Sequence, residues 1–114
     1  MADDVVYIDF ADGVKRVMNN TKLYTKLLTK FKNDTNLNDL ETAIAAGDLE
    51  KAKNAAHTIK GLSANLSLME LNKQSLALET QIKAGSADPA QLDTVKTAFA
   101  KTLQEIDKVI SENG

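Results

Sequence analysis

The chain has a single histidine, His57, and the residue types around it at helical spacing suit phosphoryl chemistry. A neutral imidazole is a nucleophile near pH 7, and a ring nitrogen can form a bond to phosphorus. If this stretch is a helix, Lys60 and Gly61 lie on the same side as His57, and Lys53 lies one turn before it. The ammonium group of Lys60 would stabilise an anionic phosphorylated ring. Gly61 and Ala64 would leave space for a partner to reach that ring.

Spacing alone does not separate a phosphoacceptor from an ordinary surface histidine. A lone histidine on a helix is most often a surface or boundary residue, and a lysine three positions later is common. A glycine inside a helix, however, costs roughly 1 kcal/mol relative to alanine. The presence of glycine at position 61 therefore has to be explained, either by close helix packing or by access for a partner. Both interpretations of His57 stay open at this point.

The elements that must hold His57 in place are predicted to be helices. Apolar residues recur every three or four positions across residues 8–18, 23–31, 37–44, 49–66, 71–82 and 92–110. Helices of this length are marginal alone in water, so their apolar faces must be buried against one another. We therefore expect an all-α fold, an antiparallel up-and-down four-helix bundle with one or two short accessory helices. It would form one domain over residues 1–114, with its core at about 8–110.

The register of the fourth segment predicts where the imidazole points. Its core stripe passes through Ala52, Ala56, Ile59 and Ser63. His57 is one helical step of about 100° round from Ala56. The imidazole is therefore expected on the flank of the buried stripe or outside it.

Flexible and polar residues predict the ends of this segment. Gly47 is suited to the left-handed position that closes the third helix, and Asp48 can then cap the fourth. Beyond the fourth helix, the stretch from Ser67 to Glu70 fits a capping box. In that interpretation Ser67 is the N-cap of the fifth helix.

Composition argues against several functions. With 14 basic and 16 acidic residues the net charge is −2, and tryptophan is absent, so a nucleic-acid surface is not expected. One histidine and no cysteine cannot build the common zinc sites, and the chain lacks a glycine-rich phosphate loop for ATP. The acidic start over residues 1–4 does not resemble a secretion signal, and no stretch approaches the roughly 20 apolar residues of a membrane span. We therefore expect a cytoplasmic protein.

The segment AHTIKGLSANL, residues 56–66, resembles the signature of histidine-phosphotransfer (HPt) domains. In that family, His-x-x-Lys-Gly surrounds the phosphorylated histidine. The framework on either side is similar as well, through the stretches 20–31, 47–50 and 78–79 and through Leu71. The resemblance spans about residues 8–110. The combination is fairly specific, whereas His-x-x-Lys-Gly alone would be weak.

The resemblance implies roles for individual residues. His57 becomes the phosphoacceptor, Lys60 the phosphate-stabilising cation and Gly61 the opening that admits the partner. Glu79 stands where similar domains often place a glutamine or other polar group that hydrogen-bonds the imidazole. Lys83 stands where some members have a second basic residue. For these last two residues, a solvated ion pair along one helix is the alternative.

One position departs from the family pattern, because Ser67 stands where many members have glycine as the helix turns. The sequence therefore does not predict the backbone conformation of the turn at Ser67.

The resemblance also implies a mechanism and partners. The chain would be a phosphoryl carrier without a cofactor or ATP site of its own. It would exchange phosphate with response-regulator receiver domains, including that of a hybrid sensor histidine kinase, and the receiver would supply Mg²⁺. We expect a monomer that binds neither nucleic acid nor a membrane. Two alternatives stay open: a helical adaptor that binds receivers without carrying phosphate, and the dimerisation domain of a histidine kinase.

Overall fold

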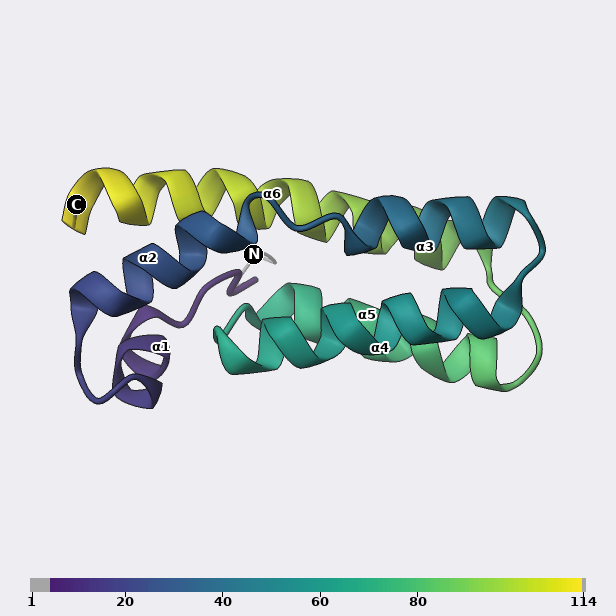
Figure 1. Cartoon of the computed structure of the whole chain (residues 1–114), viewed down its shortest axis with the longest axis horizontal. Coiled ribbons are helices and arrows are strands. Elements are labelled where there is room, and N and C mark those ends of the chain that lie inside the picture. Colours follow the sequence, from purple (N-terminus) through teal and green to yellow (C-terminus); the bar gives the residue numbers. More distant parts are fainter. Residues whose placement is uncertain (1–4, 114) are drawn as a thin grey trace.

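The computed structural model describes residues 5–113, so the acidic start over residues 1–4 lies outside the described residues. Within them the chain forms six helices and no strand, which confirms the prediction of an all-α fold (Figure 1). The helices are α1 (Phe10–Arg16), α2 (Thr21–Phe31), α3 (Asn36–Ala45), α4 (Leu49–Asn65), α5 (Met69–Lys83) and α6 (Pro89–Asn113).

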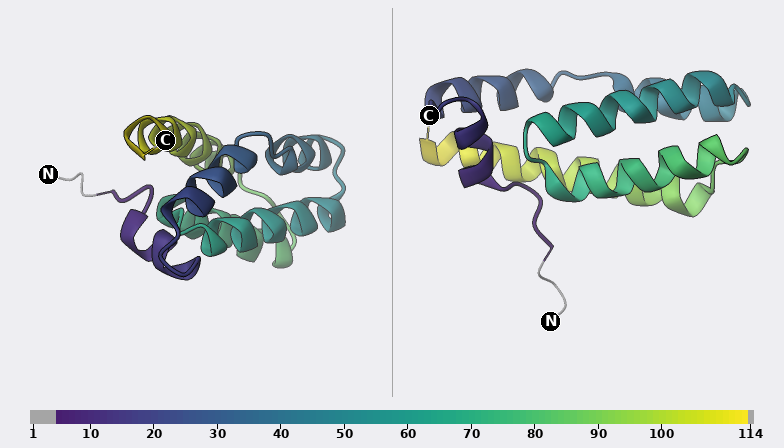
Figure 2. Two further views of the ribbon diagram at one scale, coloured as in Figure 1. Left: turned by 60° about the vertical axis from the view of Figure 1, so that its left-hand side comes forward. Right: turned by 90° about the horizontal axis from the view of Figure 1, so that it is seen from below.

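The helices pack in a chain of neighbours that places α4 and α5 together. α4 contacts α3 on one side and α5 on the other, and α5 also contacts α6. α2 packs against α6, and the short α1 packs against α2. Figure 2 shows α4 and α5 side by side, joined by a tight turn. Any site on the exposed side of α4 is therefore bordered by α5.

The apolar stripe of α4 is buried as its spacing predicts. Ala52, Ala56, Ile59 and Ser63 each have none of their surface exposed. Because two of these side chains are alanines, the neighbouring helices can approach α4 closely. The same register turns His57 away from the core, and its side chain is exposed.

The start of α4 is also as predicted. Gly47 adopts a left-handed backbone with φ of 74°, and its N–H donates to the carbonyl of Ile44 at 3.0 Å. The carboxylate of Asp48 accepts a hydrogen bond from the N–H of Lys51 at 3.1 Å. This cap satisfies one of the free donors in the first turn of α4.

The capping box predicted at Ser67 is wrong. Ser67 has φ of 57° and ends α4 in the left-handed position that usually favours glycine. Its N–H donates to the carbonyl of Ala64 at 3.3 Å, and the N–H of Leu68 donates to that of Ser63 at 2.8 Å. Leu68 rather than Ser67 is the N-cap of α5, and it makes no side-chain cap.

The Ser67 hydroxyl instead binds the N-terminal part of the chain. It donates to Oδ2 of Asp12 at 2.6 Å, and Arg16 Nε donates to the same oxygen at 2.9 Å. The hydrogen bond from Ser67, followed by that from Arg16, lowers the pKa of the Asp12 carboxyl. The N–H of Asp9 also donates to the Ser67 carbonyl at 2.9 Å. A left-handed residue other than glycine costs roughly 1–2 kcal/mol, and these contacts offset part of that cost.

α1 is shorter than the predicted segment 8–18, because Met18 and Asn19 both have positive φ and end it in a turn. Gly13 inside α1 lies against the ring of Tyr24, and a Cβ there would overlap the ring. The Tyr24 hydroxyl donates to the carbonyl of Leu66 at 2.5 Å. Gly13 thus allows α1 to close over a tyrosine that also binds the end of α4.

Two glycine substitutions should therefore have opposite effects on stability. Gly13→Ala should lower the free energy of unfolding by about 1–3 kcal/mol, because the added methyl group overpacks the Tyr24 contact. Gly61→Ala, whose Cβ would meet nothing within 4 Å, should raise it by up to about 1 kcal/mol. Urea unfolding followed by circular dichroism measures both. A Gly13→Ala chain as stable as the wild type would contradict this account of α1.

Candidate functional site

The imidazole of His57 lies at the surface above a buried carboxylate from the next helix. The His57 side chain on α4 is 64% exposed, whereas Glu79 on α5 is only 2% exposed. The distance between His57 Nδ1 and Glu79 Oε2 is 2.9 Å, which is hydrogen-bonding distance. α5 therefore holds one edge of the ring and leaves the rest open to solvent.

The charge state of Glu79 determines which ring nitrogen can react. Burial raises the pKa of Glu79, but hydrogen bonds and charge from Lys60, His57 and Lys83 outweigh it and hold the pKa below its ordinary value of 4.5. The carboxylate is therefore ionised near neutral pH and can only accept hydrogen bonds. In the neutral ring, Nδ1 must carry the proton, and its N–H donates a hydrogen bond to Glu79. Nε2, at the opposite edge of the ring, keeps a free lone pair.

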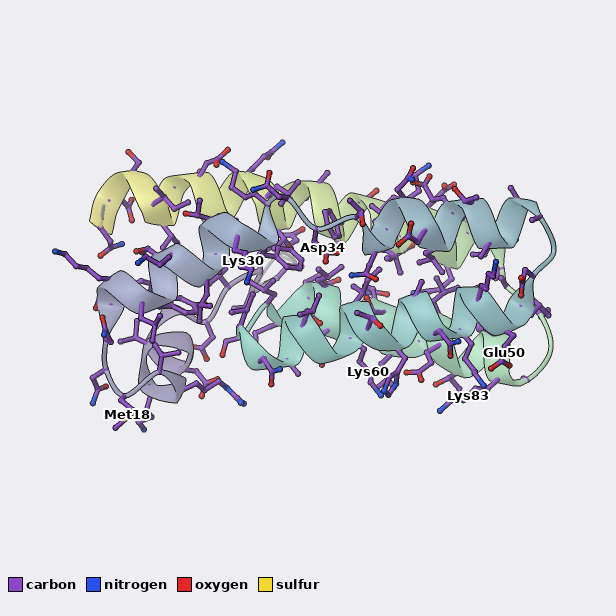
Figure 3. All side chains as sticks on the ribbon, in the orientation of Figure 1. Met18, Lys30, Asp34, Glu50, Lys60 and Lys83 are labelled. Atoms are coloured by element: carbon purple, nitrogen blue, oxygen red, sulfur yellow. The ribbon has the colours of Figure 1, made fainter. Side chains whose placement is uncertain are left out.

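Two lysines share the same carboxylate. Lys60 Nζ lies 3.1 Å from Glu79 Oε1, and Lys83 Nζ lies 3.4 Å from Oε2. Figure 3 shows both lysines projecting from the same edge of the molecule, which α4 and α5 form. Because Glu79 is almost fully buried, a solvated surface pair does not describe its contact with Lys83. Two cations and one carboxylate leave a local charge of +1 beside a neutral ring.

The remaining residues singled out in the sequence lie on α4. Gly61 is part-exposed and Ala64 is exposed, on the side of the helix that carries His57. No contact within the described chain requires Gly61 to be a glycine, because a Cβ there would meet no atom within 4 Å. Lys53 pairs with Glu50 at 3.4 Å and is not brought to the Glu79 carboxylate.

One polar contact at the site was missed in the sequence. Asn72 on α5 donates from Nδ2 to the main-chain carbonyl of Lys60 at 2.9 Å, and the Ser63 hydroxyl donates to the same carbonyl at 2.9 Å. Asn72 lies two helical turns before Glu79, on the same face of α5. That seven-residue spacing is visible in the sequence and is the signal that could have identified it.

Residues 5–113 contain no helix with the length and apolar character of a membrane span. They also contain no group of three or more histidine, cysteine, aspartate or glutamate side chains placed to hold a metal ion.

Comparison with known proteins places the chain in a family. The model of the Hpt domain matches residues 27–109, from within α2 to within α6. The match covers more than half of the 114 residues and includes His57, Lys60, Gly61 and Glu79. No curated protein and no solved structure matches the chain. Because the family match runs from α2 to α6 and covers most of the chain, the chain belongs to the Hpt domain family.

Proposed function

We propose that this protein accepts a phosphoryl group on His57 from a receiver-domain aspartate and passes it to another receiver. Membership of the Hpt family supports a histidine-phosphotransfer role in phosphorelays in general. The observation that carries the specific proposal is the contact of His57 Nδ1 with Glu79, because it directs Nε2 outward as the nucleophile.

The transfer step can be written from these atoms. The lone pair of His57 Nε2 attacks the phosphorus of the aspartyl phosphate, so an N–P bond forms. The P–O bond to the aspartate breaks, and its electron pair stays on the departing carboxylate. Both ring nitrogens are then substituted, Nδ1 by its proton and Nε2 by phosphorus, so the ring gains positive charge. Glu79, 2.9 Å from Nδ1, stabilises that charge as it develops.

The phosphoryl oxygens need cations of their own. Lys60, one turn from His57 on α4, is the nearest candidate, and the exposed Lys83 is the second. The Mg²⁺ expected on the receiver would neutralise further charge on the transferring group. This chain needs no cofactor of its own in the proposed scheme. In the return transfer the same groups act in reverse order.

The receiver should dock over the face that carries Gly61 and Ala64, where one residue has no side chain and the other only a methyl group. A groove of about 820 Å³ lies between the C-terminal end of α4, which contributes Leu62, and α2, which contributes Leu27 and Lys30. Its apolar lining and the cations around it suit a partner with apolar contacts beside an acidic site.

We further propose a cytoplasmic monomer in which α3, α4, α5 and α6 form the up-and-down bundle. A single core cluster joins side chains from α2 to α6, so one subunit supplies a complete core. The dimerisation domain of a histidine kinase, which contributes two helices per subunit, does not share this property. Native mass spectrometry separates the two, since the proposal requires one chain per particle.

Removing the nucleophile tests the proposal directly. His57→Gln should take up no label from a phosphorylated receiver, because the amide has no nucleophilic ring nitrogen. The substituted side chain is exposed, so the variant should unfold at nearly the wild-type temperature. Label found on the His57→Gln chain would contradict the assignment and favour another acceptor. A wild-type chain that binds receivers but takes no label would favour the adaptor instead.

Removing the negative charge beneath the ring tests the role of Glu79. Glu79→Gln should slow transfer to His57 by about tenfold, because the amide oxygen still accepts a hydrogen bond from Nδ1 but no longer balances the positive charge of the ring. Rapid-quench measurement with a phosphorylated receiver gives the rate. Glu50→Gln is the matched control, because it removes an exposed carboxylate that pairs only with Lys53 among the described contacts. Equal rates for the Glu79→Gln and Glu50→Gln chains would exclude this role.

A further inference from the structure

Two buried side-chain oxygens of α5 make no hydrogen bond of regular geometry within the described residues, although one of them is paired with a lysine. They are the hydroxyl oxygen of Ser75 and Oε1 of Glu79. Ser75 is 1% exposed and Glu79 is 2% exposed, so solvent does not satisfy either group. Residues four apart on a helix are neighbours on one face. Glu79 Oε1 has the ammonium group of Lys60 at 3.1 Å, whereas the Ser75 hydroxyl, one turn away, has no partner among the described residues.

The same face of α5 is turned toward α4. Asn72, Ser75 and Glu79 follow one another at spacings of three and four. Asn72 at one end donates to the Lys60 carbonyl of α4. Glu79 at the other end contacts the His57 ring of the same helix. Ser75, which lies between them on α5, therefore faces α4 beneath the site.

Packing alone does not explain a serine at this position. A small residue between α4 and α5 lets the helices approach, but alanine would do this and has a higher helix propensity. α4 uses alanine for the same purpose at positions 52 and 56. A buried hydroxyl without a partner costs free energy that alanine avoids. The Ser75 hydroxyl is therefore a candidate for a role that helix packing does not explain.

Phosphorylation of His57 would give this hydroxyl such a role. Before transfer, Glu79 Oε1 faces the ammonium group of Lys60 at 3.1 Å. A phosphoryl group on Nε2 carries more negative charge than one carboxylate and lies on the solvent side, so it attracts Lys60 away. Oε1 would then be a buried carboxylate oxygen without a cation, at the time when Glu79 must balance a charged ring.

We propose that Ser75 is a positioning residue for phosphotransfer, whose hydroxyl turns to donate to Glu79 Oε1 when Lys60 moves to the phosphoryl group. This inference rests on the proposed function and adds a residue to it. Rotation about a single side-chain bond moves a serine hydroxyl between staggered positions without moving the backbone. The new hydrogen bond keeps Glu79 ionised and in place beneath the ring.

Direct phosphorylation by phosphoramidate tests this step without a receiver. In that reaction the N–P bond to His57 Nε2 forms as the P–N bond of phosphoramidate breaks and ammonia leaves. Ser75→Ala should slow labelling of the full chain roughly two- to tenfold, the effect of one ordinary hydrogen bond. The unphosphorylated variant should be at least as stable as the wild type in urea, since it loses only an unsatisfied hydroxyl.

Two further variants separate a role through Glu79 from a general packing effect. In a Glu79→Met background, which offers no oxygen to accept the bond, Ser75→Ala should not change the rate. Thr102→Val removes a buried hydroxyl of α6 that already donates to the Ala98 carbonyl, and it should leave the labelling rate unchanged.

Each outcome decides between the proposals. A Ser75→Ala chain labelled at the wild-type rate overturns the inference, as does an equal slowing in the Glu79→Met background. Neither result touches the carrier function. A wild-type chain that reacts with phosphoramidate but exchanges phosphate with no receiver contradicts the proposed relay and leaves the role of Ser75 to be judged on the phosphoramidate rates alone.

Discussion

The proposed chemistry of this protein depends on one contact, the hydrogen bond between Nδ1 of His57 and the buried carboxylate of Glu79. The contact crosses from α4 to α5, so it exists only where the two helices pack closely. Alanine and serine side chains along the buried face of α4 make that approach possible. The contact fixes the proton on one ring nitrogen and leaves the other free. A flexible surface histidine would have neither property.

A buried carboxylate is unfavourable unless charges and hydrogen bonds compensate for its lost hydration. Here Lys60, Lys83 and the imidazole supply that compensation, and the pKa of Glu79 lies below its ordinary value despite burial. A domain that only bound its partner would not need this arrangement beneath an exposed ring. In a phosphoryl carrier, the carboxylate would balance the positive charge that develops on the ring, and the lysines would balance the negative phosphoryl group.

Much of the fold followed from patterns within single segments. The core stripe of α4 and the left-handed Gly47 were read from the sequence, because each depends on a few neighbouring residues. The exposure of His57 followed from the same stripe. Ser67 was misassigned because its conformation depends on a distant partner, Asp12, rather than on the capping signal around it. Family resemblance pointed to Glu79, but its contact with His57 depends on the register between two helices, which spacing along one helix does not determine.

The polar residues that face α4 from α5 illustrate the same limit. Asn72 and Ser75 have the spacing of one helix face, but only the packed structure shows that this face meets the site. The extent of α1 could not be read from its apolar pattern, because the turn at Met18 and Asn19 adopts positive φ without a glycine to signal it. Helices whose pattern is set by many neighbouring residues were therefore predictable from the sequence. Contacts that single residues make with distant parts of the chain were not.

The most direct test of the central claim is to determine which ring nitrogen carries the phosphate. The chain would be labelled with ¹⁵N, phosphorylated by a receiver and studied by ¹H–¹⁵N and ³¹P NMR under basic conditions that preserve phosphohistidine. The account predicts phosphorus on Nε2 of His57, because Nδ1 is held by Glu79. Phosphorus on Nδ1, or on any residue other than His57, would contradict it.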